Sequence, residues 1–293
     1  MMTLSFITDI FKYDFLLIAL IAGFILGILA PLLGSIVVVR RLSFIADTLG
    51  HFSLVGISFS LFLSSLGFKF FFENEFLLGV VFSVIGGLLI EFFRRSYKNY
   101  KEISMVIVIS LGAALSAIFF ALASATGSLY EYLFGSILTI GFDSLLVIIA
   151  TLIAVIIIFI FFGKKIIAVS FDEMNAKFMG INVGIFQIIF MVMLSIVVSV
   201  LLEAAGVLLI SSLMVIPVAA GMRIGWSYKS TVIIAIIFSE LSVLVGFWLT
   251  YSVSIPSGAA IVSVNIFILL LVAFIKRIIN IKRIKKTSIR KKI

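Results

Sequence analysis

Nine apolar segments dominate the sequence, and each is long enough to cross the hydrocarbon core of a bilayer as a helix. Only 12% of the residues are charged and 63% are hydrophobic, whereas a soluble domain has about 25% charged residues. Such long apolar runs exclude an outer-membrane barrel, whose strands alternate. We therefore predict one all-α, multi-pass membrane domain over residues 1–293, with eight or nine transmembrane helices. The segments lie near residues 15–39, 43–66, 76–93, 103–125, 143–162, 183–202, 205–222, 230–250 and 258–275.

Basic residues gather in alternate connections between these segments. Lys and Arg are concentrated in residues 40–41, 94–101, 164–177 and 223–229. They are also concentrated in the tail, 276–293, where nine basic residues occur without an acid. The positive-inside rule therefore places these connections and the C-terminus in the cytoplasm. Nine spans put the N-terminus outside, and eight spans with both ends inside remain the alternative. The basic tail is expected to lie on anionic headgroups, and no nucleic-acid partner is expected.

The segment from Tyr130 to Leu138 is too short to span and too apolar for a free loop. Tyrosines are common at the level of the lipid headgroups. We predict an interfacial or re-entrant helix here.

Asp47 and the only histidine, His51, lie four residues apart inside an apolar run. On a helix they share one face, and a carboxylate with an imidazole suits Zn²⁺ or Mn²⁺. The structural alternative is that Asp47 pairs with Arg40 or Arg41 and that His51 is a hydrogen-bonded packing residue. Two ligands are too few to hold a metal tightly, so the pair is predicted to be a transit site, completed by a second chain or another carboxylate.

Other acidic residues are further candidates for the metal path. Glu240 is mid-span between serines and must face protein or water, because an unpaired charge in lipid is costly. Glu203 lies at the outer end of a span, where an entrance or interface role is expected. Glu73 and Glu75 lie in an outside loop, where contact with a binding protein is the alternative to simple solvation.

The connection from about 164 to 182 is predicted to hold a short, well-terminated helix. Ser170 is the predicted N-cap, with Glu173 completing a capping box, and Gly180 is the predicted C-cap. This helix is either a plain amphipathic connector or a docking element for a cytoplasmic partner. Two prolines are candidate hinges. Pro217 is expected to kink its helix and Pro256 to mark a turn into the last span, with static bends as the alternative.

Four landmarks occur in order along nearly the whole chain. They are Arg40-Arg41-Leu42-Ser43 with Asp47 to His51, Leu133-Phe134-Gly135-Ser136-Ile137-Leu138, Phe171-Asp172 with Ala176 and Gly180, and Gly206-Val207-Leu208-Leu209 with Pro217 followed by Pro256 to Ala260. In these landmarks the chain resembles the permease subunits of ABC importers for zinc, manganese and related divalent cations, closest to the zinc type.

The resemblance implies a type II-like ABC importer permease fold, a homodimer in the bacterial inner membrane and two kinds of partner. These are a cytoplasmic ABC ATPase subunit and an extracytoplasmic metal-binding protein that delivers the ion. Phe171, Asp172, Ala176 and Gly180 are then similar to the coupling helix that contacts the ATPase.

The chain itself carries no Gly-x-x-x-x-Gly-Lys-Ser/Thr phosphate loop. It is therefore predicted not to be an enzyme, with ATP hydrolysed by the partner. No permanently bound cofactor is expected. The cargo is ranked zinc, then manganese, then iron. The alternatives are an ion-coupled secondary transporter that uses Asp47, His51 and Glu240, and an ABC permease for a siderophore or cobalamin.

Overall fold

The computed structural model describes residues 8–10, 12–67, 75–97, 100–125, 127, 132–133, 135–253 and 255–290. Within this part, nine helices are long and apolar enough to cross a membrane, so the nine predicted spans are confirmed as helices. Their bounds are α2 Asp14–Val39, α3 Ile45–Ser65, α4 Glu75–Ser96, α5 Lys101–Leu122, α7 Phe142–Phe171, α9 Val183–Ala205, α10 Val207–Ile224, α11 Tyr228–Val253 and α12 Ser257–Arg290. Two short elements complete the described chain: the 3₁₀ turn η2, Ile137–Thr139, and the helix α8, Glu173–Phe178.

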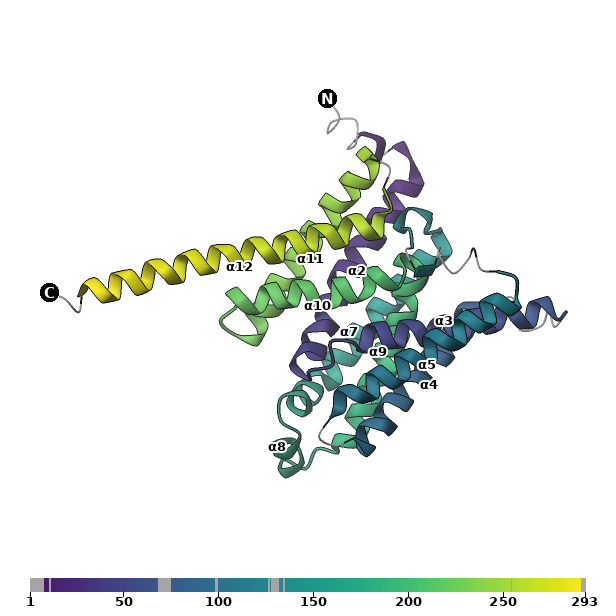
Figure 1. The fold of residues 1–293 in the computed structure, drawn as a ribbon, viewed down its shortest axis with the longest axis horizontal. Helices are drawn as coiled ribbons and strands as arrows, with labels where there is room; N and C mark the ends of the chain where they lie inside the picture. The colour runs from purple at the N-terminus through teal and green to yellow at the C-terminus, as the bar shows by residue number, and fades with distance from the viewer. Residues whose placement is uncertain are drawn as a thin grey trace.

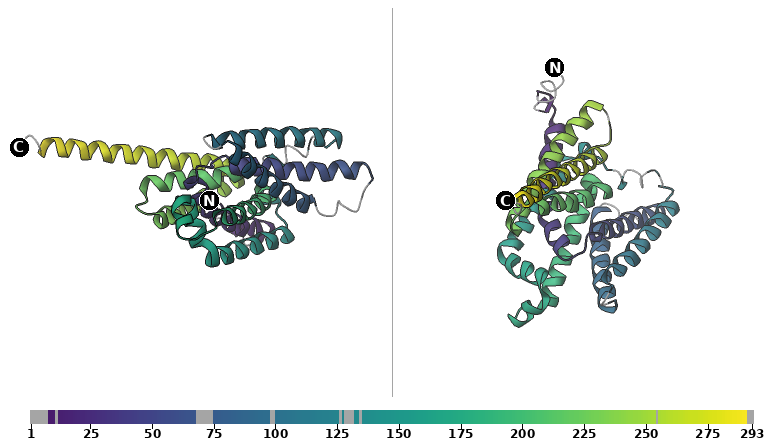
Figure 2. Two further views of the ribbon diagram at one scale, coloured as in Figure 1. Left: turned by 90° about the horizontal axis from the view of Figure 1, so that it is seen from below. Right: turned by 60° about the vertical axis from the view of Figure 1, so that its left-hand side comes forward.

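The helices form two packed groups (Figures 1 and 2). In one, α3 packs against α4, α5 and α9; in the other, α10, α11 and α12 pack on one another, and α10 and α11 also pack on α2. The groups meet where α10 contacts α3 and α9, and α7 covers α9 and α2. Close crossings depend on small residues. A Cβ on Gly34 of α2 would lie 1.9 Å from the carbonyl oxygen of Met214 on α10, so only glycine permits this backbone approach.

Successive long helices run in opposite directions, so their basic termini collect at one end of the bundle. Arg40 caps the C-terminus of α2, Arg94 lies in the last turn of α4, and Arg223 lies in the last turn of α10. We call this end, which also carries α8, the basic end. The opposite end has acids in the first turns of α2, α4 and α7. This distribution agrees with the predicted orientation.

Two helices are longer than predicted. α7 continues past its apolar run to Phe171, so Lys164 and Lys165 are helical rather than in a loop. The last span likewise continues to Arg290, and the basic tail is helical up to that residue. Residues 259–290 contain no glycine or proline, so nothing in the sequence stops this helix. Figure 1 shows α12 projecting beyond the other helices.

The predicted helix at 130–138 is present only in part among the described residues, because Tyr132 and Leu133 are helical but the residues from Gly135 onward are not α-helical. Gly135 and Ser136 are non-helical, and Ile137–Thr139 forms only the single 3₁₀ turn. Tyr130, Glu131 and Phe134 lie outside the described residues. Gly135 has a positive φ of 55°, which interrupts a helix at this point.

Candidate functional site

The first candidate site is the Asp47–His51 pair, which the structure places one turn apart near the start of α3. Both side chains are half-buried. The Ser211 hydroxyl of α10 hydrogen-bonds the Asp47 carboxyl. His51 Nδ1 is buried and has no hydrogen-bond partner. The pair therefore presents one carboxylate and one unengaged ring nitrogen, both of which can bind a divalent cation.

The structural alternative for this pair receives no support. Within the described part of the chain, Asp47 forms no ion pair with Arg40 or Arg41, since both recorded ion pairs involve Glu91. The surroundings of His51 are tightly packed. A Cβ on Gly112 of α5 would lie 3.3 Å from the His51 Cβ. The pair thus sits where α3 meets α5 and α10.

Each chain offers few ligands at this point. No group of three or more His, Cys, Asp or Glu side chains that could hold a metal occurs among the residues that the structure describes. A structural zinc site has four protein ligands. The transit role of the pair, in which an ion must be able to leave as well as bind, stays a prediction.

Glu240 lies on a different interface from the pair. Its helix, α11, packs against α2, α10 and α12, and its carboxylate faces Gly27 of α2, where an added Cβ would lie 2.7 Å from Oε1. Both carboxylate oxygens are buried without a hydrogen-bond partner. Glu240 is therefore not part of the Asp47 site, where the carboxyl is hydrogen-bonded to Ser211 instead.

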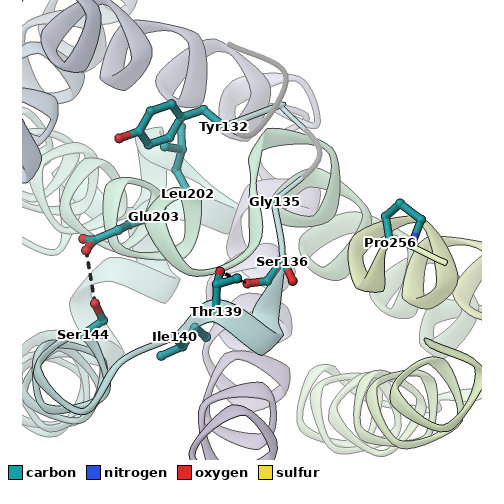
Figure 3. A pocket seen from close by; sticks show the side chains of 9 residues that line it. All are labelled: Tyr132, Gly135, Ser136, Thr139, Ile140, Ser144, Leu202, Glu203 and Pro256. Atoms are coloured by element: carbon teal, nitrogen blue, oxygen red, sulfur yellow. Dashed lines mark hydrogen bonds between the residues drawn. The ribbon is translucent and has the colours of Figure 1, made fainter. Parts of the chain in front are cut away.

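Glu203 lines a cavity of about 710 Å³ at the opposite end of the bundle (Figure 3). The Ser144 hydroxyl donates a 3.2 Å hydrogen bond to Glu203 Oε1. Nearby, the Tyr132 hydroxyl donates a 3.1 Å hydrogen bond to Glu75 Oε2. Hydroxyl and carboxylate oxygens thus form part of the wall of this cavity, and such oxygens can bind divalent cations. Glu73 lies outside the described residues.

The short helix α8 is present, but its predicted N-cap is wrong. Asp172, not Ser170, is the capping residue, because its Oδ1 accepts hydrogen bonds from the backbone N–H groups of Met174 at 2.9 Å and Asn175 at 3.0 Å. The Ser170 hydroxyl instead donates to the Ile166 carbonyl inside α7. α7 therefore continues past Ser170, and the chain turns at Asp172.

Glu173 does not complete a capping box. Its Oε1 accepts a 3.0 Å hydrogen bond from Gln187 Nε2, which ties the start of α8 to α9.

The C-terminal end of α8 is as predicted. Gly180 has a φ of 76°, and the Gly180 and Ile181 N–H groups donate to the carbonyls of Lys177 and Ala176, each at 3.0 Å. This is a Schellman motif, which favours glycine at the left-handed position.

α8 buries Ala176 against Val169 and Val183. Its other face is open, with Phe178 84% and Met179 74% exposed.

Two of the sequence landmarks meet at the opposite end. Gly206, with a φ of 76°, is the only residue between α9 and α10. Gly135 packs on this turn so closely that an added Cβ would lie 2.2 Å from the carbonyl carbon of Ala205. The Ile137 N–H donates a 3.0 Å hydrogen bond to Ser257 Oγ. These residues therefore form a packed joint.

The two candidate hinges differ in position. Pro217 lies inside α10, which continues through it. Pro256 directly precedes α12, as predicted for a turn, and also lines the Glu203 cavity. The hinge role of both residues stays a prediction.

The whole arrangement can now be compared with known proteins. The sequence matches the family described as the ABC 3 transport family over residues 12–276. The chain belongs to the ABC 3 transport family. It is therefore a multi-pass protein of the bacterial inner membrane, in a family of metal transport permeases.

Relatives of this ABC 3 protein are named for two metals. It is 27% identical to the manganese transport system membrane protein MntC of Listeria monocytogenes, over 88% of this chain and 90% of that protein. It is 30% identical to the high-affinity zinc uptake system membrane protein ZnuB of Buchnera aphidicola, over 86% of this chain and 94% of that protein. It also resembles the solved structure of PsaBC from Streptococcus pneumoniae in complex with Fab, with a TM-score of 0.82, 26% identity and coverage of 96% and 99%.

Several contacts of this ABC 3 protein were not expected from the sequence. Ser211 and Gln187 reach their partners across different helices, and no local pattern marks such pairs. The buried ion pair of Arg94 with Glu91, at 3.1 Å, did leave a signal. Opposite charges three residues apart on a helix are neighbours.

Proposed function

We propose that this protein is the transmembrane permease subunit of an ATP-driven importer for divalent metal cations, with zinc ranked before manganese. The observation that carries the proposal is the Asp47–His51 pair of α3, with a carboxylate and an unengaged imidazole nitrogen in a membrane helix. Ionisable residues inside a membrane protein mark ion pathways. Relatives named for manganese and for zinc support this cargo class.

A second copy of the chain completes the site in this proposal. Two chains related by a two-fold axis bring two Asp47–His51 pairs toward one axis, so four ligands surround the path only in the dimer. Such a shared site binds the ion in one arrangement of the subunits and releases it when they rock apart. Glu203 and Glu240 are proposed as further stations, at the entrance and in the second helix group.

ATP enters the proposal through a partner subunit. The chain has no phosphate-binding loop of its own, and α8 offers exposed apolar side chains at the basic end. We place the ATPase subunit on α8 in the cytoplasm, and a metal-binding protein at the opposite end. Closure of the ATPases on ATP then moves α8, and with it α9 through the Glu173–Gln187 hydrogen bond.

Metal uptake by point variants tests the proposal. We expect Asp47→Ala and His51→Ala each to abolish uptake of Zn²⁺ and Mn²⁺ in proteoliposomes that hold the permease, its ATPase and the binding protein. Ser43→Ala, on the same segment before the pair, serves as the control and keeps uptake. Wild-type uptake by both site variants, in complexes that assemble normally, would refute the site. If no metal-loaded binding protein stimulates ATP hydrolysis, an ion-coupled transporter is the better reading.

A further inference from the structure

A basic cavity of about 350 Å³ lies at the basic end, beside α8. Three arginines line it, Arg40, Arg41 and Arg94, together with the stretch from Ser170 to Met174. This basic cavity is separate from the Asp47–His51 pair and from the Glu203 cavity. A cation pathway has no use for guanidinium groups, so this cavity needs another explanation.

Two of these guanidinium groups each have one buried nitrogen without a partner, although Arg40 as a whole is only half-buried. Arg40 Nη2 and Arg94 Nε are both buried without a hydrogen-bond partner. Arg40 makes its recorded side-chain contact with an aromatic ring, its guanidinium carbon lying 5.2 Å from the centre of Phe190. Burial, together with the nearby charge of Arg94, lowers the pKa of Arg40 to about 10, although the charges of Glu173 and Glu91 offset part of this lowering. A buried guanidinium nitrogen without an acceptor is costly, so an anionic acceptor placed against these two nitrogens would be stabilised.

The acids nearby are already engaged. Asp172 accepts the backbone N–H groups at the start of α8, and Glu173 accepts Gln187. Glu91 pairs with Arg94 at 3.1 Å and with Arg95 at 3.6 Å. Within the described chain, none of these carboxylates makes an ion pair with Arg40.

The walls of the cavity indicate which kind of anion fits. Phe171, at the end of α7, and Met174, on α8, are 58% and 69% exposed. The still more exposed Phe178 and Met179 follow at the end of α8. Apolar side chains around a buried cation are typical of a protein–protein contact, in which a ring of apolar residues excludes water from a charged pair. A free phosphate would leave these apolar side chains uncovered.

We propose that this arginine cavity receives a carboxylate side chain of the ATP-hydrolysing partner, so that the partner holds α2 and α4 as well as α8. The inference rests on the proposed function, because it names a second contact for the same partner. Arg40 is the main binding group, and Arg94 adds its free Nε. The contact would attach the partner to the C-terminus of α2, seven residues before Asp47 in the sequence.

Affinity between the full-length permease in nanodiscs and its purified ATPase subunit tests the proposal. Removing one member of a buried, hydrogen-bonded charge pair across an interface weakens binding by about 30-fold or more. We expect that loss of affinity for Arg40→Gln. We also expect the affinity of this variant to depend less on salt concentration than that of the wild type. Arg94→Lys keeps a cation beside Glu91, so the fold is preserved, but it removes Nε and should also weaken binding.

Arg95→Gln is the matched control. Arg95 is the next residue on α4, its side chain is 66% exposed, and it does not line the cavity. We expect its affinity to stay within about fivefold of the wild type, because exposed charges contribute little to binding. Thermal unfolding of each variant in the same nanodiscs confirms that the fold is intact.

Three results would overturn the proposal. The first is equal ATPase affinity for the wild type and Arg40→Gln. The second is a rise in the unfolding temperature of the isolated permease with millimolar inorganic phosphate that disappears in Arg40→Gln, which would assign the cavity to a free oxyanion. The third is the same Arg40-dependent rise when phosphatidylglycerol replaces phosphatidylcholine in the nanodisc. Failure of the wild type itself to bind any ATPase would instead refute the proposed function.

Discussion

Asp172 is the residue on which the order of α8 depends most directly. It accepts three hydrogen bonds, from Met174 N at 2.9 Å, Asn175 N at 3.0 Å and Asn175 Nδ2 at 2.9 Å. α8 has only six residues, so it has few other internal bonds, and its remaining anchors are Ala176, the Glu173–Gln187 hydrogen bond and the turn at Gly180. The change to make is therefore Asp172→Ala.

The expected size of the effect follows from these contacts. Loss of an N-cap costs about 1 kcal/mol, and loss of a negative charge at a helix N-terminus costs about 0.3–1 kcal/mol. A total of about 1.4 kcal/mol raises the population of the locally unfolded α8 about tenfold. Asp172→Asn retains an equally good cap, so it should lose only the charge contribution, which corresponds to about a two- to fivefold change.

Hydrogen–deuterium exchange measures this population directly. Exchange of the amides of residues 173–178, in the full-length permease in nanodiscs, reports local opening. We expect about tenfold faster exchange for Asp172→Ala, with α9 unchanged, and a looser ratio of transport to ATP hydrolysis in the complete importer. Unchanged exchange in Asp172→Ala, or equal acceleration in Asp172→Asn, would refute the capping argument.

Two further variants test other parts of the fold. Gly135→Ala should destabilise the protein by about 2 kcal/mol or more, because a Cβ would overlap the backbone of Ala205 at a positive φ; thermal unfolding checks this against Gly141→Ala, where an added Cβ meets nothing within 4 Å, and equal stability would contradict it. Glu240→Gln should keep the fold and lower metal uptake, because a neutral amide binds a dication more weakly than a carboxylate. Full uptake would remove Glu240 from the path.

The helices and the candidate pair could be predicted because their signals are local. Apolar runs of the right length predicted the spans, and the spacing of Asp47 and His51 placed both on one face of α3. Gly180 was likewise predicted from the chemistry of a left-handed position. The local sequence could not distinguish Asp172 from Ser170 as the N-cap of α8, because both residue types are good caps. The point at which α7 ends decides between them.

Contacts between distant segments could not be predicted in this way. Ser211 reaches Asp47, and Gly135 covers Gly206, only because of how the helices cross in three dimensions. The end of α12, by contrast, depends on a local signal, and the prediction for it was too short. The predicted span ends near residue 275 because the hydrophobic run ends there, whereas charged residues without glycine or proline continue a helix well.

Because Gly206 is the only residue between α9 and α10, a tilt of α9 as a rigid rod is transmitted directly to α10. α9 has 23 residues, which gives a rod about 34 Å long, and α8 grips its near end through Gln187. A tilt of only about 5° then moves the far end of such a rod by about 3 Å. Because a single glycine connects α9 to α10, such a displacement of the end of α9 also moves α10 and with it Ser211, which lies beside Asp47. In the proposed importer, a small displacement at the basic end would thereby reach the Asp47–His51 pair.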